Sequence, residues 1–385
     1  MSGKHRRIVV ASLSLVALLF SAAATAWAQA KWKGTIVKEG DVTVVKNPKE
    51  PIYKTPVLEL KEELSLGGPD AQGEAALDQI RQVIADGAGT LYVLDQRASH
   101  VKVFDASGKY LRTIGRKGQG PGELEYPMTI SLNEKTGELA VQQQTRGIAF
   151  FETAGPFIRQ LPLQGMLAAR GCLDSRGRIF IVDIIWGEES SKYVTKKLDG
   201  QGSLLAIIAE APTPSGPGNV LKAFMPIPYF RVDRADRLIY GYPQTYEVRF
   251  HGPAETEIVR KITREYDPVA VTAEEKAELE AGVPPGYPRD FEYPKHHPAY
   301  SRFFSSDLGH LFVQTFEKAE DGRVIHDIFD PEGRFIGRMP LKPSGLEIFK
   351  GKYYAIEEDE EGYQYVKRYA VTWKVEVPDR ETGRG

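Results

Sequence analysis

Cysteine is almost absent from this chain of 385 residues, because Cys172 is the only one. A single thiol excludes an intramolecular disulfide framework, so the core must stabilise the fold. Cys172 lies in the apolar segment 171–173. A buried, unreactive thiol is expected there rather than a nucleophile.

An excess of charge is also missing. The 50 Lys and Arg residues nearly balance the 52 Asp and Glu residues, which gives a formal net charge of -2. No net field favours a polyanion, so nucleic acid is not an expected partner.

Common enzyme signatures are missing as well. Residues 115–122 are rich in Gly, but they lack the Gly-Lys-Ser/Thr ending of a phosphate-binding loop, and there is no Gly-x-Ser-x-Gly motif. A zinc site needs three or four ligands that converge on one point, and the spacing of the histidines provides no such set. We therefore expect no metal and no cofactor. The histidines after residue 28 are His100, His251, His296, His297, His310 and His326.

The first 28 residues have the three parts of a secretory signal. Lys4, Arg6 and Arg7 precede an apolar run over residues 8–20, and the small-residue site Ala26-Trp27-Ala28 follows. Residues 8–28 are also just long enough to span a bilayer, so an uncleaved anchor is the alternative. No cysteine is available at the cleavage site for a lipid, and no later apolar run approaches membrane length. The expected location is periplasmic or extracellular, without a lipid anchor or a stable membrane span.

One short pattern occurs six times along the chain. A polar turn that closes on Gly or an equivalent residue is followed by four to six alternating or β-branched residues, and a second hairpin comes after it, most clearly at 101–114. A four-stranded unit of about forty residues cannot bury both of its faces alone, so such units stack radially and share their cores. The six copies span 86–95, 133–141, 174–183, 233–240, 306–313 and 350–356.

The ends of the chain predict closure of the ring. Residues 57–66 form one strand before the first copy, and the last copy stops after the strand 363–373, one strand short. An N-terminal strand that completes the last blade would remove exposed sheet edges. Residues 35–46 predict a further strand pair. The expected fold is thus an all-β, six-bladed β-propeller that forms a single domain over residues 31–385.

An insertion at 266–300 separates the fourth and fifth copies. Thr272 and Glu275 have the spacing of a capping box, and Gly282 is a C-terminal stop, which together predict one short acidic helix. A loop rich in Pro and aromatic residues follows. Its candidate contact residues are Arg289, Tyr293, His296 and His297.

The first copy resembles a full NHL repeat. The resemblance rests on Leu91-Tyr-Val-Leu-Asp95, Val101-Lys-Val-Phe104, Gly108 and Lys117-Gly-Gln-Gly-Pro-Gly-Glu-Leu124 with Pro127. Later copies match only in the turn and the strand after it. The insertion is similar to that of secreted bacterial six-bladed propellers of unknown function. This resemblance implies a fold and leaves the function open, because propellers of this kind include metal-dependent lactonases, an amidating lyase and non-catalytic binding modules.

Alignment of the inner strands by their closing turns places five residues at one level of the central channel. Arginine and tyrosine side chains there would suit a carboxylate or another anionic group. Alternatively, these polar groups satisfy one another and the channel water. The five residues are Gln82, Thr129, Arg170, Tyr229 and Arg302.

Two functional hypotheses follow. The first is an exported, non-catalytic and monomeric binding propeller that contacts a protein, peptide or glycan through its loops, where function on a rigid scaffold usually lies. The alternative is a metal-dependent hydrolase or lyase that acts at the channel mouth, which requires metal ligands that converge in the channel.

Overall fold

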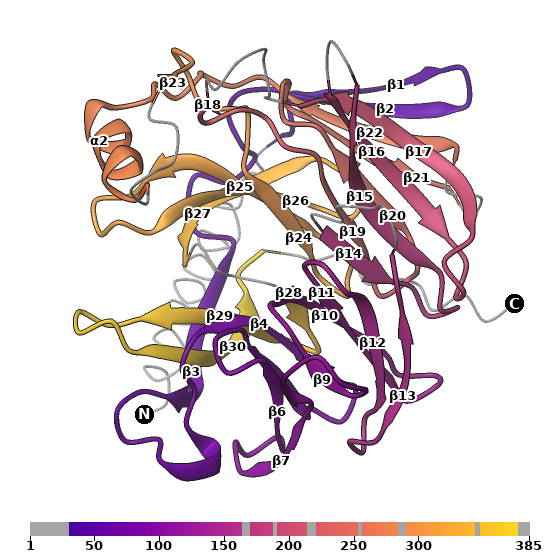
Figure 1. Cartoon of the computed structure of the whole chain (residues 1–385). Coiled ribbons are helices and arrows are strands. Elements are labelled where there is room, and N and C mark those ends of the chain that lie inside the picture. The colour runs from indigo at the N-terminus through magenta and orange to yellow at the C-terminus, as the bar shows by residue number, and fades with distance from the viewer. Residues whose placement is uncertain are drawn as a thin grey trace, which may run out of the picture.

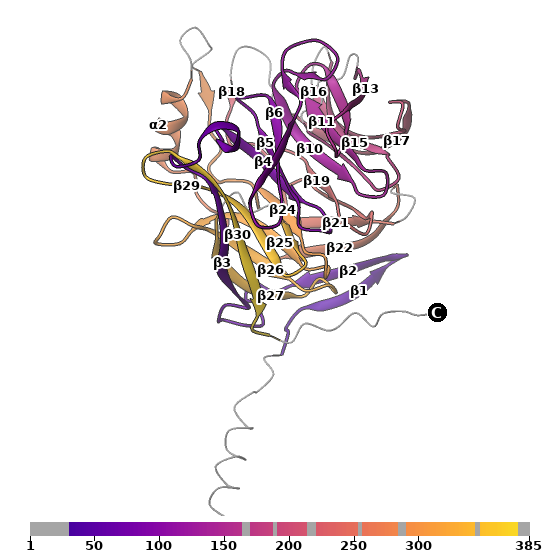
Figure 2. The same cartoon turned by 90° about the horizontal axis from the view of Figure 1, so that it is seen from below.

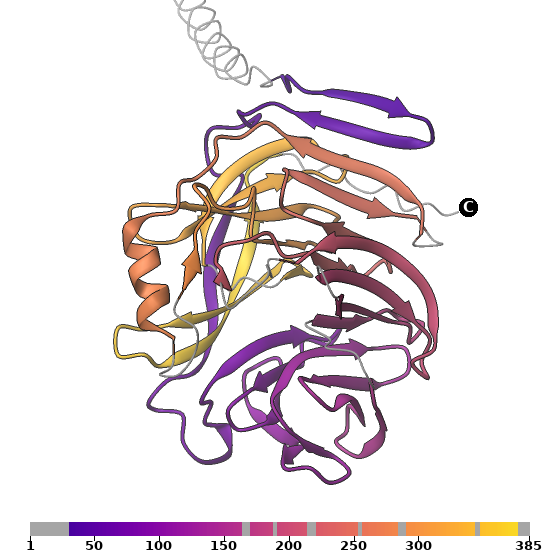
Figure 3. The same ribbon diagram turned by 45° about the horizontal axis from the view of Figure 1, so that its top comes forward.

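The computed structural model describes residues 31–163, 170–187, 191–213, 221–252, 256–283, 290–342 and 347–375. The expected signal peptide, residues 1–28, lies outside the described residues. Within them, six blade sheets are arranged in a ring, each built on four antiparallel strands (Figures 1 and 3). The predicted all-β six-bladed propeller is therefore confirmed.

Blades 1 to 3 each contain four strands, which follow one another from the inside of the ring outward. Blade 1 consists of β4 (Ile80–Ala85), β5 (Leu91–Asp95), β6 (His100–Phe104) and β7 (Tyr110–Ile114). Blade 2 consists of β10 (Pro127–Asn133), β11 (Glu138–Gln143), β12 (Gly147–Glu152) and β13 (Phe157–Leu161). Blade 3 consists of β14 (Arg170–Leu173), β15 (Ile179–Trp186), β16 (Ser191–Leu198) and β17 (Leu204–Pro212).

Blades 4 and 6 include strands from the N-terminal part of the chain. Blade 4 consists of β19 (Tyr229–Val232), β20 (Leu238–Gly241), β21 (Glu247–His251) and β22 (Ile258–Arg264), to which β2 (Val42–Asn47) and β1 (Thr35–Glu39) are added. Blade 5 consists of β24 (Arg302–Ser305), β25 (Leu311–Lys318), β26 (Val324–Phe329) and β27 (Phe335–Leu341). Blade 6 consists of β28 (Glu347–Phe349), β29 (Lys352–Glu358), β30 (Gln364–Trp373) and β3 (Leu58–Gly67).

The ring is closed by β3, as the sequence predicts. It pairs antiparallel with β30 from Leu58 opposite Trp373 to Gly67 opposite Tyr365. A strand that precedes blade 1 in the sequence therefore forms the outer edge of blade 6. The predicted strand pair at 35–46 is also present. Its inner strand β2 pairs parallel with β22, and Figures 2 and 3 show the β1–β2 hairpin on the outside of the ring.

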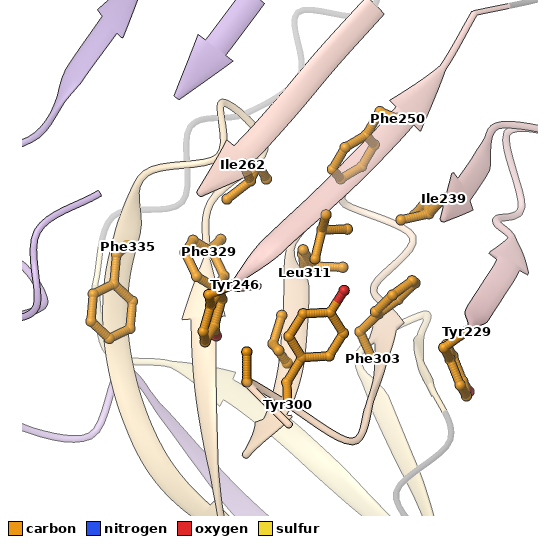
Figure 4. Close-up of a cluster of buried hydrophobic side chains, with 13 residues drawn as sticks. Tyr229, Ile239, Tyr246, Phe250, Ile262, Tyr300, Phe303, Leu311, Phe329 and Phe335 are labelled. Atoms are coloured by element: carbon orange, nitrogen blue, oxygen red, sulfur yellow. The ribbon is translucent and has the colours of Figure 1, made fainter. Parts of the chain in front are cut away.

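Each blade buries its two faces against its two neighbours. The buried apolar residues form six clusters, and every cluster joins a pair of adjacent blades. Figure 4 shows the cluster between blades 4 and 5, where the ring of Tyr246 packs against the rings of Tyr300 and Phe329. The stability of one blade therefore depends on the presence of both neighbours.

In blades 1, 3 and 4, turns that begin with aspartate connect the inner strand to the second strand. In blade 1, one side-chain oxygen of Asp86 accepts the backbone N–H groups of Ala88 and Thr90 at 2.9 and 2.8 Å, and Gly89 has a φ of 88°. Blade 4 has Asp236, with a φ of 58°, where this turn has glycine. Its carboxylate accepts the N–H of Ser175 in blade 3 at 2.8 Å, so a contact between blades offsets the unfavourable backbone conformation.

Two short strand pairs and two short helices lie in the linkers of the described part of the chain. The 3-10 helix η1 (Gly73–Ala75) precedes blade 1, β8 (Arg116–Lys117) pairs with β9 (Glu123–Leu124) between blades 1 and 2, and α2 (Ala273–Ala281) follows blade 4. The linkers before and after blade 4 meet through β18 (Leu221–Lys222) and β23 (Phe291–Glu292), which pair parallel.

Buried His326 should make stability depend on pH. Its side chain is fully inaccessible, and burial lowers its pKa from 6.5 to about 4, although a hydrogen bond to the carbonyl of Val324 opposes this shift. The unfolded chain binds a proton near pH 6.5 but the folded chain does not, so stability is fully present above pH 6.5 and falls as the pH drops towards 4. The loss amounts to up to about 3 kcal/mol.

Urea unfolding at pH 7.5 and pH 4.5 measures this loss. The variant His326→Leu cannot take up the proton, so the difference between its two unfolding free energies should be smaller than in the wild type. His100, whose pKa burial also lowers, accounts for part of the remaining difference. An equal pH difference in wild type and variant would contradict the prediction.

Candidate binding site

A cavity of about 440 Å³ lies in the channel between the inner strands. Strands β4, β10, β14 and β19 supply most of its wall, and blades 5 and 6 contribute Arg302 and Glu347. Pockets that hold small ligands have volumes of roughly 300 to 1,000 Å³. The end where the inner strands begin is called the start face here, and the end where they turn into the second strands is called the turn face.

Four of the five predicted channel residues line this cavity. Gln82, Thr129, Tyr229 and Arg302 belong to its wall. Arg170 is placed by its backbone, which pairs with Val182 in blade 3, and its side chain lies outside the described residues. The alignment by closing turns therefore located the channel wall, whereas binding by these residues stays a prediction.

Gln82 and Thr129 hold neighbouring blades together. The amide of Gln82 donates to the carbonyl of Ile130 at 3.1 Å and accepts its N–H at 2.8 Å, and the hydroxyl of Thr129 donates to the carbonyl of Gly171 at 3.0 Å. An inner strand has a strand partner on one side only, so its second backbone edge needs other partners. These two side chains supply them, which agrees with the alternative interpretation that the channel residues satisfy protein groups.

Tyr229 and Arg302 differ from that pair. Tyr229 is 8% exposed and packs edge-on against Phe303, with ring centroids 4.9 Å apart, so it belongs mainly to the core. The Nε of Arg302 donates to the side chain of Gln314 at 2.8 Å. Arg302 is half-buried and keeps a guanidinium group on the cavity wall.

Arg234 crosses the turn face of the channel. From blade 4 it reaches Glu134 in blade 2 at 2.8 Å, Glu347 in blade 6 at 2.9 Å and the carbonyl of Ala85 in blade 1 at 2.7 Å. Its guanidinium group lies 3.4 Å from the ring centroid of Phe349. Blade 4 stands opposite blade 1 in a ring of six, so a side chain that makes these contacts must lie across the channel.

Burial and charge act in opposite directions on Arg234. Burial disfavours its charged form, but the carboxylates of Glu347 and Glu134 outweigh this effect and raise its pKa. The sequence analysis did not identify Arg234, although the alignment of the copies contained a signal. The position five residues after each predicted channel residue lies in the turn, and among these five equivalent positions only blade 4 has a cation. The five residues are Gly87, Glu134, Ser175, Arg234 and Asp307.

The carboxylates of the cavity wall have partners. Glu134 and Glu347 pair with Arg234, Asp233 pairs with Arg237 at 2.6 Å, and Asp236 accepts from Ser175. Asp174 pairs in the same way with Arg178, four residues later. The acidic groups of the wall are therefore already matched by protein groups.

Arg81 differs from these paired groups. It lines the cavity, it is exposed, and no hydrogen bond or ion pair joins it to another described residue. It lies at a register shift between Ile80 and Gln82, where a bulge can redirect a side chain. Arg231 and Arg302 place two more guanidinium groups on the wall.

Large apolar side chains are exposed at the start face. Tyr126 directly precedes β10, and Ile227 precedes β19 by two residues. Trp186 ends β15, four residues beyond Val182, which pairs with the first residue of β14. They are 65%, 54% and 63% exposed, respectively. Tyr126 also has a φ of 46°, an unfavourable conformation for a bulky residue. We call Tyr126, Trp186 and Ile227 the apolar rim.

The insertion carries the predicted helix. In α2, Thr272 and Glu275 form the capping box, with the N–H of Glu275 donating to the Thr272 hydroxyl at 3.2 Å. No residue of α2 is buried. Two polar contacts connect the helix to the following loop, because Glu275 lies 3.0 Å from His297 and the hydroxyl of Tyr293 donates to Glu280 at 2.7 Å. Partial burial and this carboxylate raise the pKa of Tyr293 to about 12.

The expected contact residues of the insertion differ in how far they are buried. His297 is 6% exposed and stacks on Phe316 with ring centroids 4.3 Å apart, so it does not contribute to an exposed surface. Tyr293 and His296 are half-buried. Arg289 lies outside the described residues. The adjacent histidines thus point to different environments, as expected for an extended loop.

Replacing Glu275 with alanine should loosen α2 without unfolding the propeller. The change removes one half of the capping box and the partner of His297, and a lost cap alone costs about 0.5 to 2 kcal/mol. Amide hydrogen exchange in residues 273–281 should then be about tenfold faster. The melting temperature should change little, because α2 buries no residue. Glu274→Ala is the matched control, and equal exchange in the two variants would contradict the assigned role of Glu275.

Metal ligands do not gather in the described part of the chain: there, no group of three or more His, Cys, Asp or Glu side chains is placed to hold a metal ion. A search of the same residues for a helix with the length and apolar character of a membrane span finds none.

Comparison with known proteins supports the fold. A family model described as a 6-bladed beta-propeller, DUF5128, matches residues 71–177. The structure is similar to a candidate exported protein from Bacteroides fragilis NCTC 9343, with a TM-score of 0.57, 13% identity, and coverage of 86% of this chain and 100% of that one. It is also similar to a member of the DUF4221 family from Bacteroides vulgatus ATCC 8482, with a TM-score of 0.51, 11% identity, and coverage of 82% and 99%.

At these identities the similarities show the fold alone. A gluconolactonase from Xanthomonas campestris aligns with a TM-score of 0.44 and 13% identity over 77% of this chain and 88% of that one, which carries no functional argument. No curated protein matches the sequence. The class that fold and cavity define is therefore a six-bladed propeller with a ligand-sized channel cavity.

Proposed function

We propose that this protein is an exported, non-catalytic binding propeller that takes its ligand into the channel from the start face. The observation that carries the proposal is Arg81, an exposed cation on the wall of a 440 Å³ cavity without a partner among the described residues. The wall carboxylates, in contrast, are matched by protein groups. An unmatched guanidinium group in a concave site favours a ligand with an acidic group.

Export is part of this proposal. It is supported by the signal-like pattern of residues 1–28 and by the similarity to a candidate exported protein. We propose that the mature chain of residues 31–385 acts as a monomeric, NHL-like single domain in the periplasm or outside the cell. Size-exclusion chromatography of the mature chain, and fractionation of cells that express residues 1–385, test these points.

The alternative hydrolase or lyase requires metal ligands that converge at the channel. The described residues provide no such group. The discriminating measurement is the metal content and melting temperature of the mature chain with and without a chelator, calcium or zinc. A stoichiometric metal, a lower melting temperature after chelation and turnover of lactone or ester substrates would overturn the binding proposal.

Binding itself is tested by thermal shift with a panel of probes. The panel contains randomised octapeptides, an acidic oligosaccharide such as oligogalacturonate, and a neutral oligosaccharide. The proposal expects at least one acidic probe to raise the melting temperature of the wild type and to lose this effect with Arg81→Gln. Arg116→Gln is the matched control, because Arg116 is exposed in a start-face linker and does not line the cavity. Failure of all probes would overturn the proposal.

A further inference from the structure

We infer that the ligand of this cavity is the C-terminal end of a peptide or protein chain, bound through its carboxylate. The inference rests on the proposed function and specifies its ligand class. It follows from three features of the channel: an obstructed far end, the unmatched positive charge of Arg81, and apolar side chains on part of the wall.

The obstructed end selects for a chain terminus. Arg234 crosses the turn face and is held there by Glu134, Glu347 and the carbonyl of Ala85. Lys350 adds a further contact across blades, to the carbonyl of Gly87 in blade 1 at 2.5 Å. A polymer cannot pass through a channel that is crossed in this way, so a ligand that enters from the start face must present an end.

The charge on the wall selects for an acidic end. Arg81 has no partner among the described residues, and Arg231 and Arg302 also line the cavity. The guanidinium group binds a carboxylate through two parallel hydrogen bonds, and capture of a C-terminal carboxylate is a recurring mode of peptide recognition. An α-amino end, which is positively charged, would be repelled.

The remaining wall favours peptide over sugar. Recognition of sugar hydroxyls requires many polar side chains that are free to form hydrogen bonds. The polar side chains of Gln82 and Thr129 already bind the backbone of the next blade, and Ser131 accepts the N–H of Leu173 at 3.3 Å. Apolar side chains fill the spaces between them and would contact apolar residues of a peptide; these are Ile84, Met128, Leu132, Cys172, Phe230 and Val232.

The apolar rim extends the same site. A cavity of about 440 Å³ accommodates only a few residues, so the chain before them must leave over the start face. Tyr126, Trp186 and Ile227 are exposed on that face and would contact this part of the ligand. Exposed aromatic side chains offer a large contact area at low entropic cost, and they are common at binding hot spots.

Affinity selection with a randomised octapeptide pool tests the inference. The immobilised mature chain is incubated with equal amounts of the pool as free acids and as C-terminal amides, and the captured peptides are counted by mass spectrometry. We expect free acids to be captured at least tenfold more than amides. Arg81→Gln and Arg81→Glu should abolish the preference, and Arg116→Gln should keep it. Because Arg81 has no partner in the described structure, its replacement should leave the melting temperature unchanged.

Three results would overturn the inference. Equal capture of acids and amides would exclude recognition of the carboxylate. Binding of oligogalacturonate that depends on Arg81, without capture of peptides, would assign the cavity to acidic sugars and leave the proposed binding function intact. Failure of every probe, sugars included, would overturn both the inference and the proposed function.

Discussion

Replacing Asp327 with alanine is expected to lower the free energy of unfolding by about 3 to 5 kcal/mol. Asp327 in blade 5 is fully buried and accepts hydrogen bonds from the hydroxyl of Tyr246 at 2.6 Å and from Nε of Arg338 at 2.7 Å. Arg264 in blade 4 pairs with the same carboxylate at 3.0 Å. One carboxylate thus balances cations from two blades.

The expected loss is large because Arg264 cannot reach water. Its side chain is 3% exposed, and the pair with Asp327 supplies its countercharge. Removal of one partner from a buried ion pair leaves the other charge buried and uncompensated. The loss of the Tyr246 hydrogen bond adds to this cost.

Urea unfolding at pH 7.5 measures the effect. The matched control is Asp321→Ala, because Asp321 lies in the same blade and pairs with Arg323, but both side chains are largely exposed, at 50% and 42%. The control should not change the unfolding midpoint measurably, since exposed ion pairs contribute little. A midpoint for Asp327→Ala equal to that of the control would contradict the assigned role of the buried cluster.

Removal of β3 is expected to abolish cooperative folding. A chain that begins at residue 68 loses the strand that pairs with β30 along its whole length. It also loses Val57 and Leu58, which are buried between blades 5 and 6, and Leu64 and Leu66, which pack between blades 6 and 1. The ring would remain open with an apolar edge exposed, so we expect insoluble protein without a cooperative melting transition.

Two further chains make this test specific. A chain that begins at Asp41 keeps β2 and β3 and lacks β1, whose residues are all exposed, together with the hydrogen bond of 3.0 Å from Trp32 to Asn47. It should melt close to the wild type. A permuted chain that begins at residue 68 and carries residues 57–67 after residue 375, through a short glycine linker, should fold again. In the native sheet Leu58 pairs with Trp373, so this linker would close an antiparallel hairpin. Folding of the chain from residue 68 without the added strand would contradict the closure argument.

The sequence predicts local structure well where a short segment is sufficient to specify it. The turn at Asp86 and Gly89 and the capping box of Thr272 and Glu275 are formed as expected, because their hydrogen bonds join residues two to four apart. The closing strand could be inferred because the sixth copy lacks a strand. The repeat also located the channel wall, since equivalent positions in equivalent units meet around one axis.

Contacts between distant segments could not be read in the same way. The expected surface position of His297 is wrong because Phe316 and Glu275 enclose the side chain, and neither is close to it in sequence. The contacts of Asn47 could not be predicted from the sequence either. Its amide donates to the carbonyl of Gly333 and accepts the N–H of Phe335, 288 residues away, and nothing in the strand pattern singles it out.

The sequence by itself thus determined the number of blades, their order, the closing strand and the level of the channel wall. These properties depend on repeated local patterns and on the need of each blade to bury two apolar faces. Only the tertiary structure decided that Arg234 crosses the turn face, that Asp327 balances two arginines, and that Arg81 has no partner among the described residues. These outcomes depend on which side chains meet when the ring closes, and ring closure joins segments that no local pattern relates.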